Sequence, residues 1–450
     1  MKLSQWCHSF EKNGITALVH SLTLGVVFIK TNELKKFLRN LTESQQKTSN
    51  RLSKILISQG LLIQHPCEDE ELLIRIREKL KSELSVELLY LIVTDGCNLR
   101  CKYCFEESPK SNKPFKAMKM DEETLLKAID LFAKTTALYG NPQKDKVIHL
   151  YGGEPMTNRV AVYKAILYIK KLQTQKTLPD NCRIAIVTNG VLINEADAKL
   201  FAENNVTVGL SIDGPASITD LYRIPKKASI QVTKQIMNAF ELLKKHGVNI
   251  GLSVTLTPRA IDNFDEFLDF FTTNEFQNIA GMSLNLLHYT PHLDLPNDYY
   301  QTAVDCQIKA FTRFRKLGLY EERLMRKVTA FILQKTMYAD CGVVGQQLVV
   351  APDGRIGVCQ DFIKPRTYFS RSVYDNDQTN LIESFFEGWR ERSPLFMNQC
   401  KNCSALGICG GGCPASAELK NGDRNSVDER ICYHSKKILE WLIWDSYELL

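Results

Sequence analysis

The sequence predicts an α/β fold for most of this chain, organised around a partial parallel barrel. From Leu88 onward, six apolar strand candidates alternate with amphipathic helices. Such strand–helix repetition predicts a parallel sheet with right-handed crossovers. Six strands are too few for a full eight-stranded barrel, so we expect a partial, TIM-like (β/α)6 barrel. Its functional residues should follow the carboxyl ends of the strands, as they do in complete barrels.

The strand candidates are short apolar segments separated by helical patterns. They are ELLYLIVT, KVIHLYG, RIAIVTN, TVGLSID, NIGLSVTLT and GMSLNLLHY. Between them, helices are predicted at 121–139, 157–173 and 229–246. Asn194 as N-cap, with Asp197 three residues later, marks the start of a further helix. Two more helical stretches, 298–317 and 321–337, follow the last strand.

The two ends of the chain have different patterns of predicted secondary structure from the middle. Strand candidates such as ITALVHS and GVVFIK precede helical patterns at 31–41, 45–59 and 68–84, which predicts a small winged-helix-like domain. Beyond Cys341 the chain is rich in loops, and QQLVVAPDGRIGVCQDF predicts a hairpin that turns at Pro352-Asp353-Gly354. The last residues form an apolar helix. We therefore expect three domains, at 1–85, 86–320 and 321–450.

Composition and charge argue against several classes of protein. The 450 residues are 44% hydrophobic and 24% charged, as in ordinary globular domains, and the net charge of +6 comes from scattered lysines. The best apolar run, 15–29, is short and interrupted, and the N-terminus lacks the apolar core of a signal peptide. We expect no nucleic-acid partner, no membrane span and a cytoplasmic location. There, fourteen cysteines favour metal ligands or free thiols over disulfides.

Three cysteines directly follow the first predicted barrel strand. In TDGCNLRCKYCFEE they are Cys97, Cys101 and Cys104, and no fourth cysteine lies nearby. A structural zinc site or a fully protein-ligated iron–sulfur cluster needs four ligands. Three thiolates on a cubane iron–sulfur cluster instead leave one iron open, and an open position lets a metal bind substrate. The alternative is a zinc knuckle completed by a distant ligand, or three unrelated thiols.

Three further motifs stand at the ends of the next three predicted strands. They are YGGEP with Gly152, Gly153 and Glu154, VTNG with Asn189, and LSIDG with Ser211 and Asp213, and Arg223 comes ten residues after Asp213. Each motif alone is weak, because glycines after a strand usually only turn the chain. Their occurrence together, in this order and on successive strands, is a much more specific signal of function than any one of them.

Together with the C-x3-C-x2-C spacing, these motifs resemble the radical S-adenosylmethionine (radical SAM) enzymes. The resemblance extends over about residues 88–435. It implies a [4Fe-4S] cluster held by the three cysteines, with the methionine amino and carboxylate groups of SAM on the open iron. One electron then cleaves the sulfonium, and the 5′-deoxyadenosyl radical takes a hydrogen atom from substrate. The family uses a low-potential donor such as flavodoxin or ferredoxin, and its clusters require anaerobic conditions.

The same resemblance assigns the residues that bind SAM. Gly152, Gly153 and Glu154 correspond to the site of the ammonium group, and Ser211 and Arg223 to contacts with ribose and carboxylate. The full set of expected cofactor-binding residues is Tyr103, Gly152, Gly153, Glu154, Asn189, Ser211, Asp213 and Arg223.

A second cysteine field lies near the C-terminus. Its C-x2-C-x5-C-x3-C motif resembles the SPASM extension, which holds two auxiliary iron–sulfur clusters, here expected to be [4Fe-4S]. The resemblance assigns Cys341, Cys359 and Cys413 to the first cluster, and Cys400, Cys403, Cys409 and Cys432 to the second. Many relatives have another cysteine where this chain has Gln347, which leaves the first cluster with an open iron or a non-cysteine ligand. The alternative, a zinc site of Cys400, Cys403, Cys409 and Cys413, leaves three cysteines unexplained.

SPASM proteins mostly modify peptides or proteins, and two subgroups compete. Anaerobic sulfatase maturases make formylglycine, with an aspartate directly after the cysteine equivalent to Cys359 as the proposed base. Here Gln360 stands in that place and Asp361 follows, which weakens this alternative and leaves Asp361 as a candidate catalytic residue. An epimerase would need a cysteine that returns a hydrogen atom, and Cys306 is a candidate.

The other subgroup, maturases of ribosomally made peptides, often carries an N-terminal winged-helix module that binds the leader of the precursor by strand addition. Residues 1–85 resemble that module, although a scaffold or oligomerisation domain is an alternative. We therefore expect a peptide maturase that acts on a leader-bearing precursor peptide and forms a thioether or carbon–carbon crosslink. Epimerisation, formylglycine formation and small-molecule dehydrogenation are alternatives. A non-catalytic iron–sulfur electron carrier or redox sensor would be a protein of another class.

Overall fold

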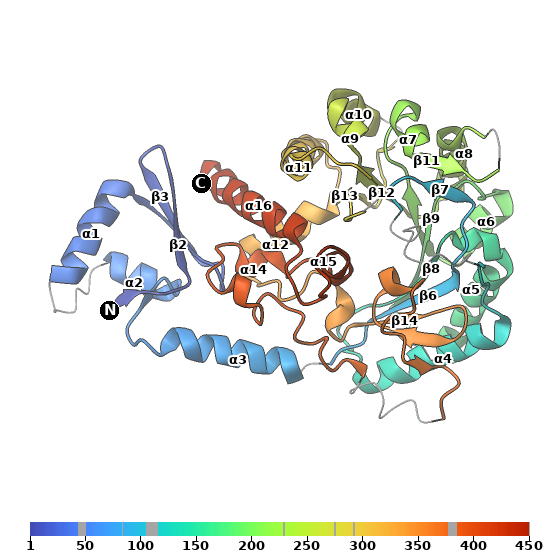
Figure 1. Cartoon of the computed structure of the whole chain (residues 1–450), viewed down its shortest axis with the longest axis horizontal. Helices are drawn as coiled ribbons and strands as arrows, with labels where there is room; N and C mark the ends of the chain where they lie inside the picture. The colour runs from blue at the N-terminus through green and yellow to red at the C-terminus, as the bar shows by residue number, and fades with distance from the viewer. Residues whose placement is uncertain are drawn as a thin grey trace. The chain divides into compact units, whose positions relative to one another are not determined.

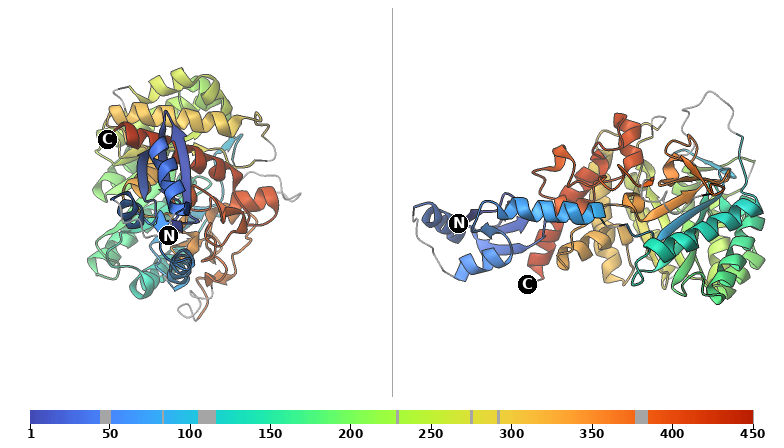
Figure 2. Two further views of the ribbon diagram at one scale, coloured as in Figure 1. Left: turned by 90° about the vertical axis from the view of Figure 1, so that its left-hand side faces the viewer. Right: turned by 90° about the horizontal axis from the view of Figure 1, so that it is seen from below.

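The computed structural model describes residues 1–43, 51–82, 84–104, 116–227, 230–273, 276–290, 293–376 and 385–449. Contacts along the chain divide it into two compact units. The terminal unit consists of 1–83, 324–341 and 390–450, and the barrel unit consists of 84–323 and 342–389. Figures 1 and 2 show the elements of both. The expected domains at 1–85, 86–320 and 321–450 stay a prediction, but the N-terminal segment and the last cysteine field share one unit.

Six parallel strands form the centre of the barrel unit, as the sequence predicted. They are β6 (Leu88–Thr94), β8 (Lys146–Gly152), β9 (Cys182–Thr188), β10 (Val206–Ser211), β12 (Ile250–Leu256) and β13 (Gly281–Leu286). Neighbouring strands in the sheet follow the order of the chain. Each strand pairs in parallel with the next, so all six carboxyl ends meet at one edge. The partial-barrel prediction is confirmed.

Helices between these strands cover one face of the sheet (Figure 1). They include α4 (Glu122–Tyr139), α5 (Arg159–Thr174), α6 (Glu195–Glu203), α7 (Ala216–Tyr222), α8 (Val232–Lys245), α9 (Pro258–Asp262), α10 (Phe264–Phe271) and, after β13, α11 (Tyr299–Lys316). The strands alternate accordingly: Ile148 and Leu150 of β8 are fully buried, whereas His149 and Tyr151 on the other face are half-buried. Asn194 and Asp197 form the expected capping box of α6.

A hairpin late in the chain enlarges the sheet. β14 (Gln347–Val350) and β15 (Arg355–Gly357) pair antiparallel, and Gly354 in their turn has a φ of +78°, which favours glycine. This confirms the predicted turn. The sequence did not predict that β14 would pair in parallel with β6, or that β16 (Arg371–Ser372) would extend the hairpin. The result is a nine-stranded sheet of order β13-β12-β10-β9-β8-β6-β14-β15-β16.

The terminal unit begins with a small α/β module. Its antiparallel sheet has the order β2 (Cys7–Lys12), β3 (Ile15–His20), β4 (Val26–Lys30), and β1 (Lys2–Leu3) pairs separately with β5 (Leu62–Ile63). Helices α1 (Thr31–Glu43), α2 (Arg51–Ser58) and α3 (Glu68–Ser82) complete it. The predicted start of the second helix, at residue 45, lies outside the described residues. The module has its own core, formed by Leu18, Ile29, Leu34, Phe37, Leu56, Leu61 and Leu62.

The C-terminal part of this unit contains α14 (Leu406–Cys409), α15 (Pro414–Asn421), α16 (Glu429–Glu448) and most of α12 (Glu322–Ile332). Trp6 and Leu22 of the N-terminal module share an apolar cluster with Leu395 and Leu406. This shared core explains why the two ends of the chain form one unit. In the part of the chain that the structure describes, no helix has the length and apolarity needed to cross a membrane.

Candidate active site at the carboxyl ends of the barrel strands

The first cysteine motif lies in a loop that continues from β6. Within this loop, β7 (Leu99–Cys101) pairs antiparallel with β11 (Arg223–Pro225), and Cys101 stands opposite Arg223 in the register. The amide of Lys102 donates to the Tyr222 carbonyl at 2.9 Å. The thiols of Cys97, Cys101 and Cys104 are all partly buried. The loop is therefore held at the carboxyl edge of the sheet by the segment that carries Arg223.

Gly152 and Gly153 are required by the close approach of this cysteine loop. A Cβ at Gly152, whose φ is +148°, would lie 2.0 Å from the Thr94 carbonyl oxygen, and one at Gly153 would lie 2.5 Å from the Gly96 oxygen. The backbone amides of Gly153 and Glu154 donate to those same two oxygens, at 3.0 and 2.9 Å. Any side chain here would displace the loop that carries the cysteines.

The carboxylate of Glu154 is fully buried and joins the ends of two strands. One oxygen accepts from the Thr188 hydroxyl at 2.7 Å and the Met156 amide at 3.0 Å, and the other accepts from the Asn189 amide at 2.7 Å. Burial raises the pKa of Glu154, and these three donors oppose that rise. Glu154 therefore ties β8 to β9 beside the cysteine loop.

The Asn189 side chain provides a second link to this loop. Its amide donates to the Asn98 side-chain oxygen at 2.8 Å and lies 3.9 Å from the Cys97 sulfur. Two of the residues expected at the cofactor, Glu154 and Asn189, thus meet each other and the segment around Cys97.

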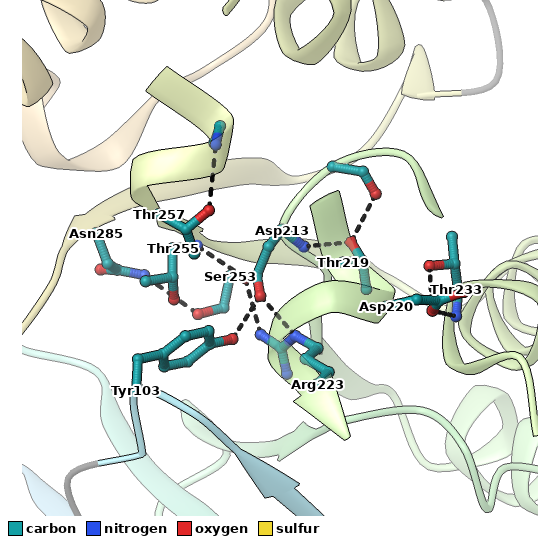
Figure 3. A network of polar contacts seen from close by, with 12 residues as sticks. Tyr103, Asp213, Thr219, Asp220, Arg223, Thr233, Ser253, Thr255, Thr257 and Asn285 are labelled. Atoms are coloured by element: carbon teal, nitrogen blue, oxygen red, sulfur yellow. Dashed lines mark hydrogen bonds and ion pairs between the residues drawn. The ribbon is translucent and has the colours of Figure 1, made fainter. Parts of the chain in front are cut away.

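Asp213 is the centre of a buried polar network (Figure 3). Arg223 donates to both of its carboxylate oxygens, Tyr103 donates its hydroxyl, and the Thr255 amide donates at 3.0 Å. The Arg223 guanidinium also lies over the Tyr103 ring, 5.7 Å from its centroid. Burial opposes the charge of Arg223, but Asp213, Tyr103 and Cys101 together outweigh it and hold the pKa of Arg223 well above its ordinary value. Three of the expected cofactor residues therefore form one unit.

A row of polar side chains begins at Ser211, the last residue of β10. Ser211 is paired in register with Ser253 of β12. The Asn285 amide of β13 donates to the Ser253 hydroxyl at 3.2 Å, and Figure 3 shows these two side chains side by side. Arg323 donates to the Asn285 oxygen at 2.9 and 2.7 Å. Hydrogen-bonding groups therefore cross three strands on the face of the sheet that carries Ser211.

The two catalytic candidates occupy different surroundings. Asp361 is half-buried in a single 3-10 turn directly after Cys359, and a carboxylate oxygen lies within 4.8 Å of a ring nitrogen of His288, which follows β13. Cys306 is on the buried face of α11, where burial raises its pKa to about 11. The structure therefore places Asp361 beside an ionisable partner, and it places Cys306 in a helix core.

Four cysteines of the second field line one cavity in the terminal unit. They are Cys400, Cys403, Cys409 and Cys432, with apolar neighbours that include Leu406 and Val427. Four thiols around a single apolar cavity fit an iron–sulfur cluster, because such clusters are held by cysteine thiolates. This is the set expected for the second auxiliary cluster. Cys413, which the zinc alternative requires, is not among the described residues that line the cavity.

The cysteines expected at the first auxiliary cluster belong to both units: Cys341 and Cys413 to the terminal unit, and Cys359 to the barrel unit. Gln347, at the position of the missing cysteine, is buried in β14, and its side-chain amide donates to the Val358 carbonyl at 2.6 Å. Through this hydrogen bond, Gln347 stabilises the backbone directly before Cys359.

The sequence did not single out two residues that the structure makes prominent. His288 could have been found, because it follows the last barrel strand, where functional residues are expected. Arg392 could not, because a lone arginine in a loop-rich segment carries no pattern. It is buried among the cysteines of the terminal unit.

Comparison with known proteins identifies the class to which this site belongs. Residues 91–271 match the family model of the radical SAM superfamily. The Clostridium novyi cysteine-type anaerobic sulfatase-maturating enzyme is 26% identical over 388 residues, which cover 79% of this chain and 95% of the relative. The radical SAM cyclopropyl synthase TigE of Paramaledivibacter caminithermalis is 26% identical over 380 residues, covering 80% of this chain and 74% of the relative.

Solved structures share the fold. Native anSMEcpe with bound AdoMet has a TM-score of 0.66 at 20% identity and covers 81% of this chain and 99% of its own. Streptococcus suis SuiB bound to precursor peptide SuiA has a TM-score of 0.54 at 13% identity and covers 96% and 99%. Residues 91–271 therefore form a radical SAM domain, which implies a [4Fe-4S] cluster and SAM. The protein is a radical SAM enzyme related to sulfatase maturases and peptide-modifying enzymes, not the non-catalytic carrier considered above.

Proposed function

We propose that this enzyme is a peptide maturase that crosslinks residues of a ribosomally made precursor through a thioether or carbon–carbon bond. The observation that carries the proposal is a groove of about 410 Å³ along β4 in the N-terminal module. Within the described residues, β4 is the end strand of its sheet, with β3 as its neighbour. An extended leader peptide can add a strand to such an edge, while apolar pockets beside it select side chains.

The lining of the groove suits a peptide with both apolar and charged residues. Val27 and Phe28 of β4 line it together with Leu52 and Ile55 of α2, and Lys30, Glu33 and Arg51 supply charge. The comparison also supports this function, because SuiB, solved with its precursor peptide, covers 96% of this chain, whereas anSMEcpe covers 81%. The extra coverage corresponds in length to an N-terminal module.

In this proposal, Cys97, Cys101 and Cys104 hold the [4Fe-4S] cluster. When bound, the cluster and SAM supply the 5′-deoxyadenosyl radical. The chain's own residues bind and orient: Gly152 and Gly153 expose backbone, Ser211 offers a hydroxyl, and Arg223 presents a guanidinium. Asp213 holds Arg223 and Tyr103 in fixed orientations, which is the preorganisation that catalytic positioning requires.

The cavity in the terminal unit would hold the second auxiliary cluster, and Cys341, Cys359 and Cys413 the first. With the Gln347 amide bonded to Val358, Cys341, Cys359 and Cys413 would be the protein ligands of the first cluster, which would supply a soft metal centre for a substrate thiolate. A flavodoxin- or ferredoxin-like donor would supply electrons.

A second candidate function is sulfatase maturation. It is favoured by the sulfatase-maturating relatives and by Asp361, which stands one residue later than the aspartate expected at the base and lies beside His288. In that function Asp361 would take the proton from a substrate thiol or hydroxyl, and His288 would orient or share it.

Mass spectrometry of candidate substrates tests these functions. A short leader-bearing peptide from a neighbouring reading frame, co-expressed with the enzyme, should lose two hydrogens for each crosslink. A sulfatase peptide carrying a target cysteine should stay free of aldehyde. Aldehyde formation on the sulfatase peptide alone would favour sulfatase maturation, and a stereochemical change without a mass change would favour epimerisation.

A further inference from the structure

Arg392 is a buried cation that forms no ion pair with a carboxylate of the residues that the structure describes. The side chain is among the largest that are fully buried, with the residue 2% exposed. Its terminal nitrogens donate to weak or neutral acceptors, the Ser426 carbonyl at 3.2 Å and the Met397 sulfur at 3.6 Å. In the described part of the chain, its Nε has no hydrogen-bond acceptor. A buried charge of this kind is costly unless negative groups nearby compensate it.

The negative groups near Arg392 are three cysteines and the Asp428 carboxylate. Burial lowers the pKa of its guanidinium, and Cys341, Cys413, Asp428 and Cys409 are close enough to oppose that effect. Asp428 is already paired with Arg430, whose Nε and one terminal nitrogen donate to its carboxylate at 3.0 and 2.9 Å. The other neighbours are cysteine thiols, which carry a negative charge as thiolates, the form in which they bind metal.

These thiols come from both expected auxiliary clusters. Cys341 and Cys413 are assigned to the first, and Cys409 to the second. Gly411 lies between Cys409 and Cys413 in the chain with a φ of +83°, and a Cβ on it would come within 3.0 Å of an Arg392 nitrogen. The guanidinium thus packs against the glycine segment that connects the two ligand sets.

We propose that Arg392 is the common counter-cation of the two auxiliary iron–sulfur clusters and raises their reduction potentials. The proposal rests on the cluster assignment made above. A thiolate-ligated cluster gains one negative charge when it accepts an electron, so a nearby buried cation stabilises the reduced form. Net charge and hydrogen bonds to the sulfurs are known determinants of cluster potential. The Nε–H, for which no acceptor is found among the described residues, could donate a hydrogen bond to a cluster sulfur.

An EPR-monitored redox titration tests this role. The full chain with Cys97, Cys101 and Cys104 changed to alanine is reconstituted anaerobically with iron and sulfide, so that only auxiliary clusters remain. Dithionite supplies one electron to each cluster. In this background Arg392→Gln removes the charge, and Arg392→Lys keeps it. Arg390→Gln is the matched control, because Arg390 donates to the Lys81 carbonyl and lies two residues away.

In Arg392→Gln we expect both clusters to have a more negative reduction potential. The expected shift is at least about 59 mV for one electron, which is tenfold in the reduction equilibrium. Arg392→Lys and Arg390→Gln should titrate close to the parent. Unchanged potentials in Arg392→Gln with full iron content would overturn the proposed role of Arg392 and leave the cluster assignment intact. If Arg392→Gln loses iron, the Arg392→Lys variant decides. Potentials in Arg392→Lys equal to those of the parent support the role of the charge. A shift in Arg392→Lys of the size expected for Arg392→Gln overturns it. A parent without iron or sulfide would overturn the cluster assignment and this proposal together.

Discussion

Arg223 and Asp213 form a buried two-point ion pair beside the cysteine loop, with nitrogen–oxygen distances of 2.8 and 3.0 Å. Both side chains come from segments that follow β10, and Arg223 stands in register with Cys101 on β7. The pair therefore couples the proposed carboxylate-binding residue to the proposed cluster-binding loop. Figure 3 shows that Tyr103 joins the same carboxylate.

Asp213→Asn should abolish most SAM cleavage and destabilise the barrel. It leaves the Arg223 charge buried with only a neutral partner, and breaking such a pair costs about 3 kcal/mol or more. We expect weaker SAM binding, less 5′-deoxyadenosine and a lower unfolding midpoint. Asp220→Asn is the control, because Asp220 caps Thr233 at 2.8 Å in the same region and its loss should cost at most about 1 kcal/mol. Equal SAM cleavage in both variants would contradict the positioning role.

His149 should make the barrel unit sensitive to acid. Its ring stacks on Tyr90 at 4.8 Å, and burial, followed by Arg183, lowers its pKa from 6.5 to about 4. Between these values the unfolded chain binds a proton that the folded chain does not, so stability falls as pH falls from 6.5 towards 4. At pH 5 this loss is roughly 2 kcal/mol.

His149→Phe keeps a ring for stacking and removes the titration, so its unfolding midpoint should depend less on pH between 7 and about 5. His65→Phe, at an exposed histidine, should show the wild-type dependence. The same acid sensitivity in His149→Phe as in wild type would refute the assignment to His149.

Cys409→Ala should separate the two kinds of cluster. The variant removes one of four thiols from the cavity in the terminal unit but leaves the cysteine loop of the barrel unit unchanged. We expect one cluster's worth of iron to be lost, SAM cleavage without substrate to persist, and crosslinked product to disappear. Cys67→Ala, at an exposed cysteine, should retain both iron and product. Parallel loss of cleavage and product in Cys409→Ala would argue against separate roles.

Ile55→Glu should weaken binding of the precursor without affecting SAM cleavage. Ile55 is 39% exposed and lines the groove beside β4, so a carboxylate there interrupts its apolar surface. The matched variant is Ile74→Glu on α3, where an isoleucine 47% exposed lies outside the residues that line the groove. Isothermal titration with the leader peptide should show at least tenfold weaker binding, about 1.4 kcal/mol, for Ile55→Glu alone. Identical affinities would exclude this groove as the leader site.

The fold could be predicted where local patterns specify it, and not where distant segments meet. The six barrel strands alternate or are fully apolar, and Asn194 with Asp197 is a local helix signal. The pairing of β14 with β6 joins Gln347 to Leu88, far apart in the chain, and no local pattern predicts such a pairing. The same limit applies to Trp6 and Leu395, whose shared cluster places both termini in one unit.

The site shows a similar division. The residue types at the strand ends are visible in the sequence, because chemistry at a barrel requires them there. Their partners are not: Asp213 is a neighbour of Tyr103 only because β7 pairs with β11. Arg392 is the residue that the sequence reveals least. Its proposed role depends on its burial and on cysteines from separate parts of the chain that lie near it.

Gly153→Ala tests whether the glycines of the second motif serve the cysteine loop. The new methyl group would lie 2.5 Å from the Gly96 oxygen, closer than any real contact, so the loop must move. Cys97 directly follows Gly96, so a shift of Gly96 also moves Cys97. We therefore expect reduced loading of the cluster in the barrel unit and less SAM cleavage, while the auxiliary cavity keeps its iron. Gly251→Ala is the control, because the nearest described atom that a Cβ there would meet is the Gly281 oxygen, at an ordinary contact distance of 3.7 Å. Full loading in Gly153→Ala would mean that the glycine acts on SAM directly rather than through the loop.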